Sequence, residues 1–420
     1  MRSTELPLPD GLLLRPLRGV RYAVDDLAAA TTPPYDLISP HEVRNLLDVH
    51  PNNVVRLILP GFDRHRYGEA RDTLRAWLAE GVLVVDDLPA LYVYEQSGPG
   101  FLQRGLIGNV GLSDPEEKII LPHEETVPGL VADRLGLMRT TEANLEPIFL
   151  LYEGGGTTSR LVDDVATTRM PLIDVRTSDG ARHRLWAVTD PDEIEAAAAD
   201  MRERQALIAD GHHRYATYRL LQQERHAAGA SNGPWDFGLA LLVDSTAYPP
   251  EVKAIHRVVP GLPLPEAVNR AKGACRVQEF TELEDALAGL ATAPGPAFVL
   301  AGEGHAHLLT DPDPVQVERA MPPGRSPRWR SLGTSVLTEF LLPKVWGVTD
   351  DERSVLIVHH DAAEAVRLAR DTSGTAILLR PLPAEDVLAV AAQGEKVPRK
   401  STSFGPKPRT GLVLRTFFTD

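Results

Sequence analysis

Apolar and polar positions along the chain follow two different periods, which predicts a mixture of helices and strands. A repeat of three to four residues predicts helices over 67–80, 131–140, 190–204, 281–290 and 362–370. Short apolar or alternating runs predict strands over 53–59, 91–96, 105–112, 147–152, 239–243, 297–301, 355–359 and 375–379, and several short strands within 160–188. Ser39 before Pro40 predicts another helix start, because serine is a good N-cap and proline fits the first helical turn.

The predicted elements fall into three blocks of mixed α and β structure, 1–100, 101–258 and 259–420. We therefore expect an α+β protein, and 420 residues are enough for two or three domains with sizeable cores. The segment 398–407 is rich in basic and hydroxyl residues. Apolar residues follow it, which predicts a folded segment rather than a frayed tail.

The strongest candidate for chemistry is the sequence Asp210-Gly211-His212-His213-Arg214. An apolar, strand-like run precedes it and a helical pattern follows at once, so Gly211 would make a sharp strand-to-helix turn. The first amides of such a helix favour an anion, and imidazole and guanidinium groups beside them favour phosphate. The alternative is a plain glycine turn with capping histidines. Adjacent histidines have poor spacing for zinc on one helix face.

Two further segments carry reactive side chains. Glu124, in the loop Leu121-Pro122-His123-Glu124-Glu125, could accept a proton from a substrate hydroxyl, or could simply be solvated. Lys400, Ser401 and Thr402 could hold a carboxylate or phosphate, or could belong to a solvated tail.

Three other groups have less specific interpretations. The prolines of Pro33-Pro34-Tyr35-Asp36 predict a structured loop whose ligand the sequence leaves open. Asp133 and Arg134 suggest an ion pair, and His256-Arg257 suggests an exposed pair or the rim of a pocket.

Bulk properties narrow the class of protein. With 43% hydrophobic and 24% charged residues, the composition is that of a soluble globular protein. No apolar run approaches a membrane span, and the start Met1-Arg2-Ser3-Thr4-Glu5 lacks the pattern of a signal peptide. Cys275 is the only cysteine, which suits a reducing cytoplasm and excludes an internal disulfide framework. A formal charge of −14 disfavours broad nucleic-acid binding.

Several of these segments, in order, resemble a family of bacterial and archaeal proteins catalogued as domain of unknown function number one thousand and fifteen. The resemblance covers nearly the whole chain. The matching segments are Pro33–Asp36, Asn53–Arg56, Leu121–Glu124, Ala132–Arg134, Asn144–Phe149, Ala209–Tyr215 and Lys400–Leu412.

Asp210–Arg214 is also similar to the phosphate-contacting turn of the ParB/sulfiredoxin-like fold. Sulfiredoxins have a cysteine where this chain has His212. Archaeal free-serine kinases of that fold are more similar, because they combine a Pro-His-Glu loop, a helix, a strand leading to Asp-Gly-His-His-Arg, and a late Ser/Thr-rich basic segment. In this chain those parts would be Pro122-His123-Glu124, the helix from Val131, Asp210–Arg214, and Gly394-Glu395 through Thr402. The stretch 160–188 would then be an insertion, and residues 1–100 have no counterpart.

The resemblance implies a ParB/sulfiredoxin-like core over 101–258, with N-terminal and C-terminal α/β extensions. It also implies that a nucleotide, ATP or ADP, phosphorylates the hydroxyl of a small metabolite, with free L-serine and O-phosphoserine as the first pair. Magnesium is expected, because phosphoryl transfer usually needs a bridging cation. The sequence shows no cluster of metal ligands, although Asp210 is a candidate acid close to the metal without binding it directly. The oligomeric state stays open.

The resemblance also assigns roles to residues. Glu124 would be the catalytic base, with Pro40-His41-Glu42 as a second copy of the same tripeptide. The phosphate-binding residues would be Asp210, Gly211, His212, His213 and Arg214, with His213 also catalytic, and the substrate-binding residues would be His123, Lys400, Ser401 and Thr402. The rival functions are a nucleotide-binding regulator of ParB type without turnover, and a small-molecule phosphatase.

Overall fold

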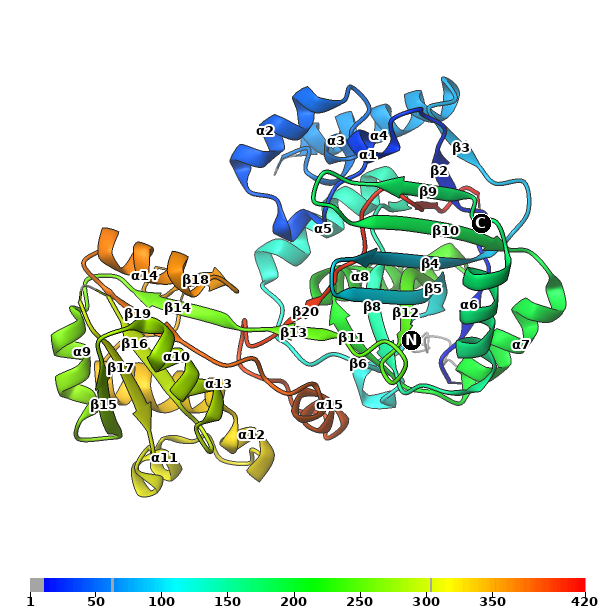
Figure 1. Ribbon diagram of the computed structural model, residues 1–420. Helices are drawn as coiled ribbons and strands as arrows, with labels where there is room; N and C mark the ends of the chain where they lie inside the picture. Colours follow the sequence, from blue (N-terminus) through cyan, green and yellow to red (C-terminus); the bar gives the residue numbers. More distant parts are fainter. Residues whose placement is uncertain (1–10, 62–63, 303, 352, 420) are drawn as a thin grey trace. The chain divides into compact units, whose positions relative to one another are not determined.

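The computed structural model describes residues 11–61, 64–302, 304–351 and 353–419 (Figure 1). Helices and several separate sheets make it an α+β protein, as predicted. The expectation of no signal peptide concerns Met1–Glu5, which lie outside the described residues. Among the helices described, none is long and apolar enough to cross a membrane.

The chain forms two compact units. Within the described residues, unit 1 extends to Pro122, from Thr126 to Pro250 and from Pro406 onward, and unit 2 contains His123–Glu125 and Glu251–Gly405. The predicted block 1–100 and most of the block 101–258 share unit 1, because β4 (Leu91–Gly98) pairs along its length with β5 (Phe101–Gly111). Residues 251–258 belong to unit 2. His123–Glu125 is a three-residue excursion from unit 1 into unit 2.

Unit 1 is built around a nine-stranded mixed sheet (Figure 1). Its order is β6 (Ile120–Leu121), β11 (Ala206–Asp210), β8 (Ile148–Tyr152), β12 (Phe237–Asp244), β5, β4, β10 (Arg182–Val188) and β9 (Ile173–Arg176), with β1 (Leu14–Arg15) beside β5. One apolar core joins inward side chains of this sheet to α6 (Gly156–Thr168), α7 (Pro191–Arg202) and α8 (His212–Ala227). Gly105 lies so close to β12 that a Cβ there would be 2.5 Å from the Leu242 carbonyl oxygen.

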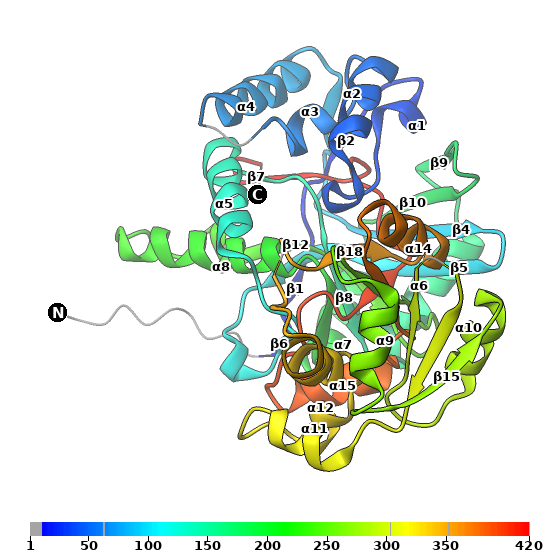
Figure 2. The ribbon, with the colours of Figure 1, turned by 90° about the vertical axis from the view of Figure 1, so that its left-hand side faces the viewer.

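A second core in unit 1 gathers the N-terminal helices. It contains side chains of α1 (Leu27–Ala30), α3 (Val55–Ile58), α4 (Arg64–Ala79) and α5 (Pro128–Thr141), and Figure 2 shows α4 beside α5. Helix α2 (Pro40–Val49) contacts α3 and buries no residue. Two small strand pairs, β2 (Val20–Tyr22) with β3 (Leu83–Val85) and β7 (Ala143–Asn144) with β21 (Arg415–Thr416), complete the unit. The predicted helix starts at Ser39 and Asp190 are confirmed, because both side chains accept hydrogen bonds from first-turn amides.

Two sequence predictions in unit 1 are wrong. The apolar run 53–59 was expected to be a strand, but Val55–Ile58 is a helical turn, and the Asn53 side chain accepts a hydrogen bond from the Val55 amide at 2.9 Å. Short apolar runs do not distinguish a buried helix from a strand. The stretch 160–188 was expected to hold only short strands, but α6 comes first, since Leu161, Val162 and Val165 have helical spacing, and the strands β9 and β10 follow.

Unit 2 contains a six-stranded sheet. Its order is β15 (Arg276–Phe280), β17 (Ala306–Thr310), β16 (Phe298–Ala301), β19 (Thr375–Leu378), β14 (Ile255–Val259) and β18 (Leu356–His359). Its core includes side chains of α10 (Leu283–Thr292) and α14 (Ala362–Asp371). The other elements of the unit are α9 (Leu264–Ala271), α11 (Pro314–Ala320), α12 (Pro327–Ser331), α13 (Gly333–Val336), a π-helix (Leu337–Trp346) and α15 (Ala384–Ala392). A strand pair, β13 (Glu251–Lys253) with β20 (Ser403–Gly405), holds the late basic segment.

Candidate active site

The predicted strand-to-helix turn is present in unit 1. Strand β11 ends at Asp210, Gly211 has a φ of +95°, and the sixteen-residue helix α8 begins at His212. A Cβ at Gly211 would lie 3.0 Å from the Ile148 side chain and 3.1 Å from Nε of Arg214, so both the backbone angle and the space favour glycine. The first amides of α8 have no partner within the helix itself, and the helix dipole makes this end attractive to anions.

Arg214 is turned inward from this helix. Its side chain is 5% exposed and donates to the Asp210 carboxylate and to the Pro147 carbonyl oxygen. Burial alone would lower the pKa of Arg214, but the nearby Glu146 and Asp210 carboxylates raise it. These contacts hold the end of β11, the start of β8 and the first turn of α8 together, which is a positioning role for Arg214.

Lys407 joins the same group from the C-terminal segment of unit 1. Its ammonium group is 2.5 Å from Oδ1 of Asp210 and also pairs with Asp36. Burial opposes the charge, but the two carboxylates raise the pKa of Lys407. The sequence indicated a structured loop at Tyr35-Asp36, and in the structure Asp36 is an ion-pair partner of Lys407.

Glu146 lies beneath the turn and is 4% exposed. It accepts hydrogen bonds from the Tyr35 amide and the Thr410 hydroxyl, both at 3.0 Å. Burial raises the pKa of Glu146, while Arg214 opposes that shift. A neighbouring cavity of about 30 Å³ has room for one or two waters but not for a nucleotide.

The two histidines of the turn differ. His212 is buried, whereas His213 is half-buried and its Nε2 accepts a hydrogen bond from the Val127 amide at 3.0 Å. Because Nε2 is an acceptor there, a neutral His213 carries its proton on Nδ1. In a neutral His213 the donor nitrogen is therefore Nδ1.

In unit 2 the loop with Glu124 meets the late basic segment. Oε1 of Glu124 accepts a hydrogen bond from the Lys400 amide at 2.6 Å, across 276 positions of sequence. The adjacent His123 is buried, its Nε2 is 2.8 Å from the Thr402 hydroxyl, and its carbonyl oxygen accepts from the Val397 amide. The structure thus brings together two predicted groups, His123-Glu124 and Lys400–Thr402.

Other contacts fix the ends of these segments. Lys396 pairs with Glu125 at 3.0 Å, and the Ser401 hydroxyl donates to the Pro398 carbonyl oxygen at 2.5 Å. Ser401 is buried, so its hydroxyl is used within its own loop.

Arg257 holds the backbone of the late basic segment, a role that the sequence did not predict. The pair His256-Arg257 was expected to be exposed or at a pocket rim, but both side chains are buried on β14, Arg257 being 1% exposed. One Arg257 nitrogen donates to the carbonyl oxygens of Arg399 and Lys400, at 3.1 and 2.8 Å. Lys400 has a φ of +53°, a conformation unusual outside glycine. Burial lowers the pKa of Arg257 to about 10.

The second Pro-His-Glu tripeptide has a structural explanation. Pro40 opens α2, and Glu42 and Ser39 form a reciprocal capping box. Glu42 therefore serves the helix start, which leaves Glu124 as the candidate base. Asp133 and Arg134 form the expected ion pair, at 2.5 Å.

The acids near the turn do not fit a resident magnesium site. Within the described ranges, no three His, Cys, Asp or Glu side chains are grouped to hold a metal ion. Asp210, the predicted acid behind such a site, is already shared by Arg214 and Lys407. A magnesium ion would have to be held mainly by the phosphates of a nucleotide.

Comparisons with known proteins give distant structural matches and a family. No curated protein matches the sequence. Solved structures with similarity include SbnI with a C-terminal truncation from Staphylococcus aureus (11% identity, 73% of this chain and 85% of that chain, TM-score 0.37). Another is a conserved hypothetical protein from Pyrococcus furiosus (14% identity, 73% of this chain and 95% of that chain, TM-score 0.34). A third is a free serine kinase in complex with AMP (15% identity, 78% of this chain and 95% of that chain, TM-score 0.35). The family model described as "Protein of unknown function (DUF1015)" matches residues 14–335, and the chain belongs to that family.

Proposed function

We propose that the protein transfers a phosphoryl group from ATP or ADP to the hydroxyl of a small metabolite, with free L-serine as the first acceptor to test. The proposal includes a ParB/sulfiredoxin-like core with α/β extensions. The observation that carries it is the hydrogen bond between Glu124 and the Lys400 amide, because it joins the candidate base to the candidate substrate-binding segment.

The phosphate groups would bind at the start of α8. The amides after Gly211, with His212 and His213, supply donors and partial positive charge where the transferred group develops negative charge. Asp210 and Arg214 would fix the geometry of the turn, since their side chains pair with each other.

Glu124 would orient the acceptor hydroxyl and take its proton as the bond from oxygen to phosphorus forms. The bond between that phosphorus and the nucleotide breaks, and the shortened nucleotide leaves with the electron pair. Lys400, Thr402 and His123 would hold the acceptor, and Ser401 would fix the loop through its hydrogen bond to the Pro398 carbonyl oxygen. Only Glu125 and Thr126 separate Glu124 from Val127, whose amide donates to His213.

The test is a matched pair of variants. Purified protein is incubated with ATP or ADP, L-serine and magnesium, and O-phosphoserine is measured by mass spectrometry. Glu124→Gln should lower the rate by about a hundredfold or more, the usual contribution of a general base. Glu125→Gln should stay near the wild-type rate, because Glu125 is exposed and pairs only at the surface with Lys396.

Three results would overturn the proposal. Equal activity in Glu124→Gln and wild type would remove the assigned base. Nucleotide binding without any consumption dependent on an acceptor would favour a ParB-type regulator. Hydrolysis of small phosphoesters in the absence of nucleotide would favour a phosphatase.

A further inference from the structure

A cavity of about 540 Å³ opens in unit 1, apart from the Asp210–Arg214 turn. It is bounded by β1, the first residues of β12, the third turn of α8 and the C-terminal segment, whose labels β1, β12 and α8 can be followed in Figure 2. Cavities of this size are typical for small-molecule ligands. Its apolar walls are Leu13, Leu17, Leu112, Phe237 and prolines 16, 89 and 234.

Three arginines line the cavity, and one of them, Arg415, is buried and donates to Asn144 and to the carbonyl oxygens of Phe237 and Pro234. The other two are Arg15 and Arg18. The Arg15 guanidinium lies over the Phe237 ring at 4.4 Å, and Arg18 donates from Nε to the Asp86 carbonyl oxygen at 2.9 Å. Among the described residues, neither arginine forms an ion pair with a carboxylate. An arginine stacked on a ring keeps its edge available for a planar anionic group.

The cavity wall also contains one acid, Asp236. Asp236 is buried and its carboxylate is engaged by three donors: His226 at 2.6 Å, Gln222 at 2.9 Å and the Gly233 amide at 2.8 Å. Asp236 therefore closes the end of α8 and is turned to its own partners. The cavity thus has apolar walls and more arginines than carboxylates, with Arg15, Arg18 and Arg415 against Asp236.

We propose that this cavity binds a small organic anion, with its apolar body against the leucines and Phe237 and its anionic group at Arg15 and Arg18. This site is separate from the proposed phosphate turn. His212 and Gln222 are ten residues apart on α8, which corresponds to about 15 Å along the helix. The inference does not depend on the proposed phosphoryl transfer.

Anilinonaphthalene sulfonate is a suitable probe, because it combines flat apolar rings with one sulfonate. Titration of the full chain, followed by fluorescence, should show one saturable site. Arg15→Gln should weaken binding about tenfold or more, since it removes the charge at the mouth. Leu13→Trp, which fills the half-buried wall, should abolish binding.

Arg71→Gln is the matched control, because Arg71 is a half-buried arginine of α4 outside the cavity that pairs with the exposed Asp72. It should bind the probe as the wild type does. Circular dichroism and thermal unfolding show whether each variant is folded, and loss of the single site in Leu13→Trp with unchanged folding supports the proposal.

Two outcomes would contradict the proposal. Several weak sites, or equal binding by wild type, Arg15→Gln and Leu13→Trp, would show that the probe does not use the cavity. Competition by ATP for the same site would show that the cavity belongs to nucleotide binding, so it would not be a separate anion site.

Discussion

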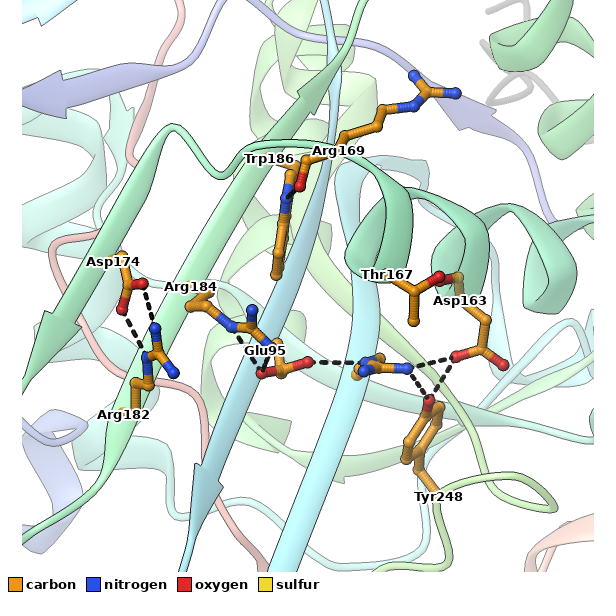
Figure 3. Close-up of polar contacts among 10 residues, drawn as sticks. Glu95, Asp163, Thr167, Arg169, Asp174, Arg182, Arg184, Trp186 and Tyr248 are labelled. Carbon is orange, nitrogen blue, oxygen red and sulfur yellow. Dashed lines mark hydrogen bonds and ion pairs between the residues drawn. The ribbon is translucent and has the colours of Figure 1, made fainter.

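Two clusters of charged residues in unit 1 differ in how the chain brings their members together. The sheet cluster consists of Glu95, Arg104, Arg184, Asp163 and Tyr248 (Figure 3). Glu95 is 1% exposed and lies directly opposite Arg104 on β5 and Arg184 on β10, with ion-pair distances of 2.7 and 2.5 Å. Strand register alone makes these residues neighbours.

The turn cluster consists of Asp36, Glu146, Asp210, Arg214 and Lys407. Its members come from loops and element ends that are far apart in sequence, Asp36 and Lys407 being 371 positions apart. It contains three carboxyl groups and two cations, and the raised pKa of Glu146 reduces that imbalance. The sheet cluster balances two arginines with two acids, so its composition needs no ligand.

This difference separates scaffold from candidate site. The sheet cluster anchors α6 to the sheet, because Arg104 reaches Asp163 at 3.1 Å and Tyr248 at 3.2 Å, and Arg184 also lies over the Trp186 ring. The turn cluster supports the start of α8, where Gly211 has a positive φ of +95°. We expect damage to the first to cost stability alone, and damage to the second to cost stability and activity.

The largest effect should come from Lys407→Met. It leaves Asp210 and Asp36 without their shared cation, and breaking such a buried pair costs about 4 kcal/mol of unfolding free energy. Urea unfolding measures this change, and the phosphotransferase rate of the folded fraction should fall as well. The control is Lys396→Met, whose exposed pair with Glu125 is worth about 1 kcal/mol or less. Equal losses in the two variants would contradict the special role of Lys407.

Lower pH should destabilise the protein through one face of β10, the face that carries His183. Arg184 belongs to the sheet cluster, whereas its neighbour His183 is buried against Tyr94, 2.8 Å from the tyrosine oxygen. Burial, with Arg409 adding to it, lowers the pKa of His183 from 6.5 to about 4. The stabilising contribution of neutral His183 is therefore complete above pH 6.5 and is lost as the pH falls toward 4.

The loss over that window is about 3 kcal/mol at most. Urea unfolding of wild type and His183→Gln at several pH values should show a shallower fall in the variant. Parallel curves would mean that His183 does not bind its proton differently in the folded and unfolded states.

Glu95→Gln should have a smaller effect, about 2 kcal/mol. Glutamine keeps the shape and one acceptor oxygen but removes the charge that faces Arg104 and Arg184. Chemical denaturation measures the loss. The phosphotransferase rate of the folded protein should be unchanged, and a fall in that rate would break the distinction between the clusters.

Tyr248→Phe should have the smallest effect, about 1 kcal/mol. The change removes a hydroxyl that donates to Asp163 and accepts from Arg104, and Asp163 is half exposed to solvent. Thermal unfolding should detect a small decrease in melting temperature. A loss as large as that of Glu95→Gln would show that the tyrosine, rather than Glu95, holds the cluster together.

Local signals in the sequence predicted the elements that depend on local chemistry. Ser39, Pro40 and Glu42 define the start of α2 through their own hydrogen bonds, and Gly211 defines the turn before α8 through its backbone angle. The run 53–59 was misassigned because a short, mostly apolar run fits a buried strand as well as a helical turn. Its packing in the second core of unit 1 favours the helical turn.

The candidate site was predictable only in part, because much of it depends on contacts between segments that are far apart in sequence. The reactive side chains of Glu124 and Lys400–Thr402 made both segments candidates, the resemblance gave them roles, and the two segments do meet. Glu146, Arg257 and Lys407 had no local pattern, because each acts through partners in remote segments. A lone charged residue becomes recognisable only when folding shows that it is buried and what it faces.

The three-residue excursion His123–Glu125 has a consequence for dividing the gene into segments. A gene segment coding for 251–405 alone would lack the partners of Lys396, Lys400 and Thr402. A segment ending at 250 would keep Glu124 but lose the amide that holds it. Recombination that exchanged either unit as a continuous piece would therefore separate the candidate base from the amide that holds it.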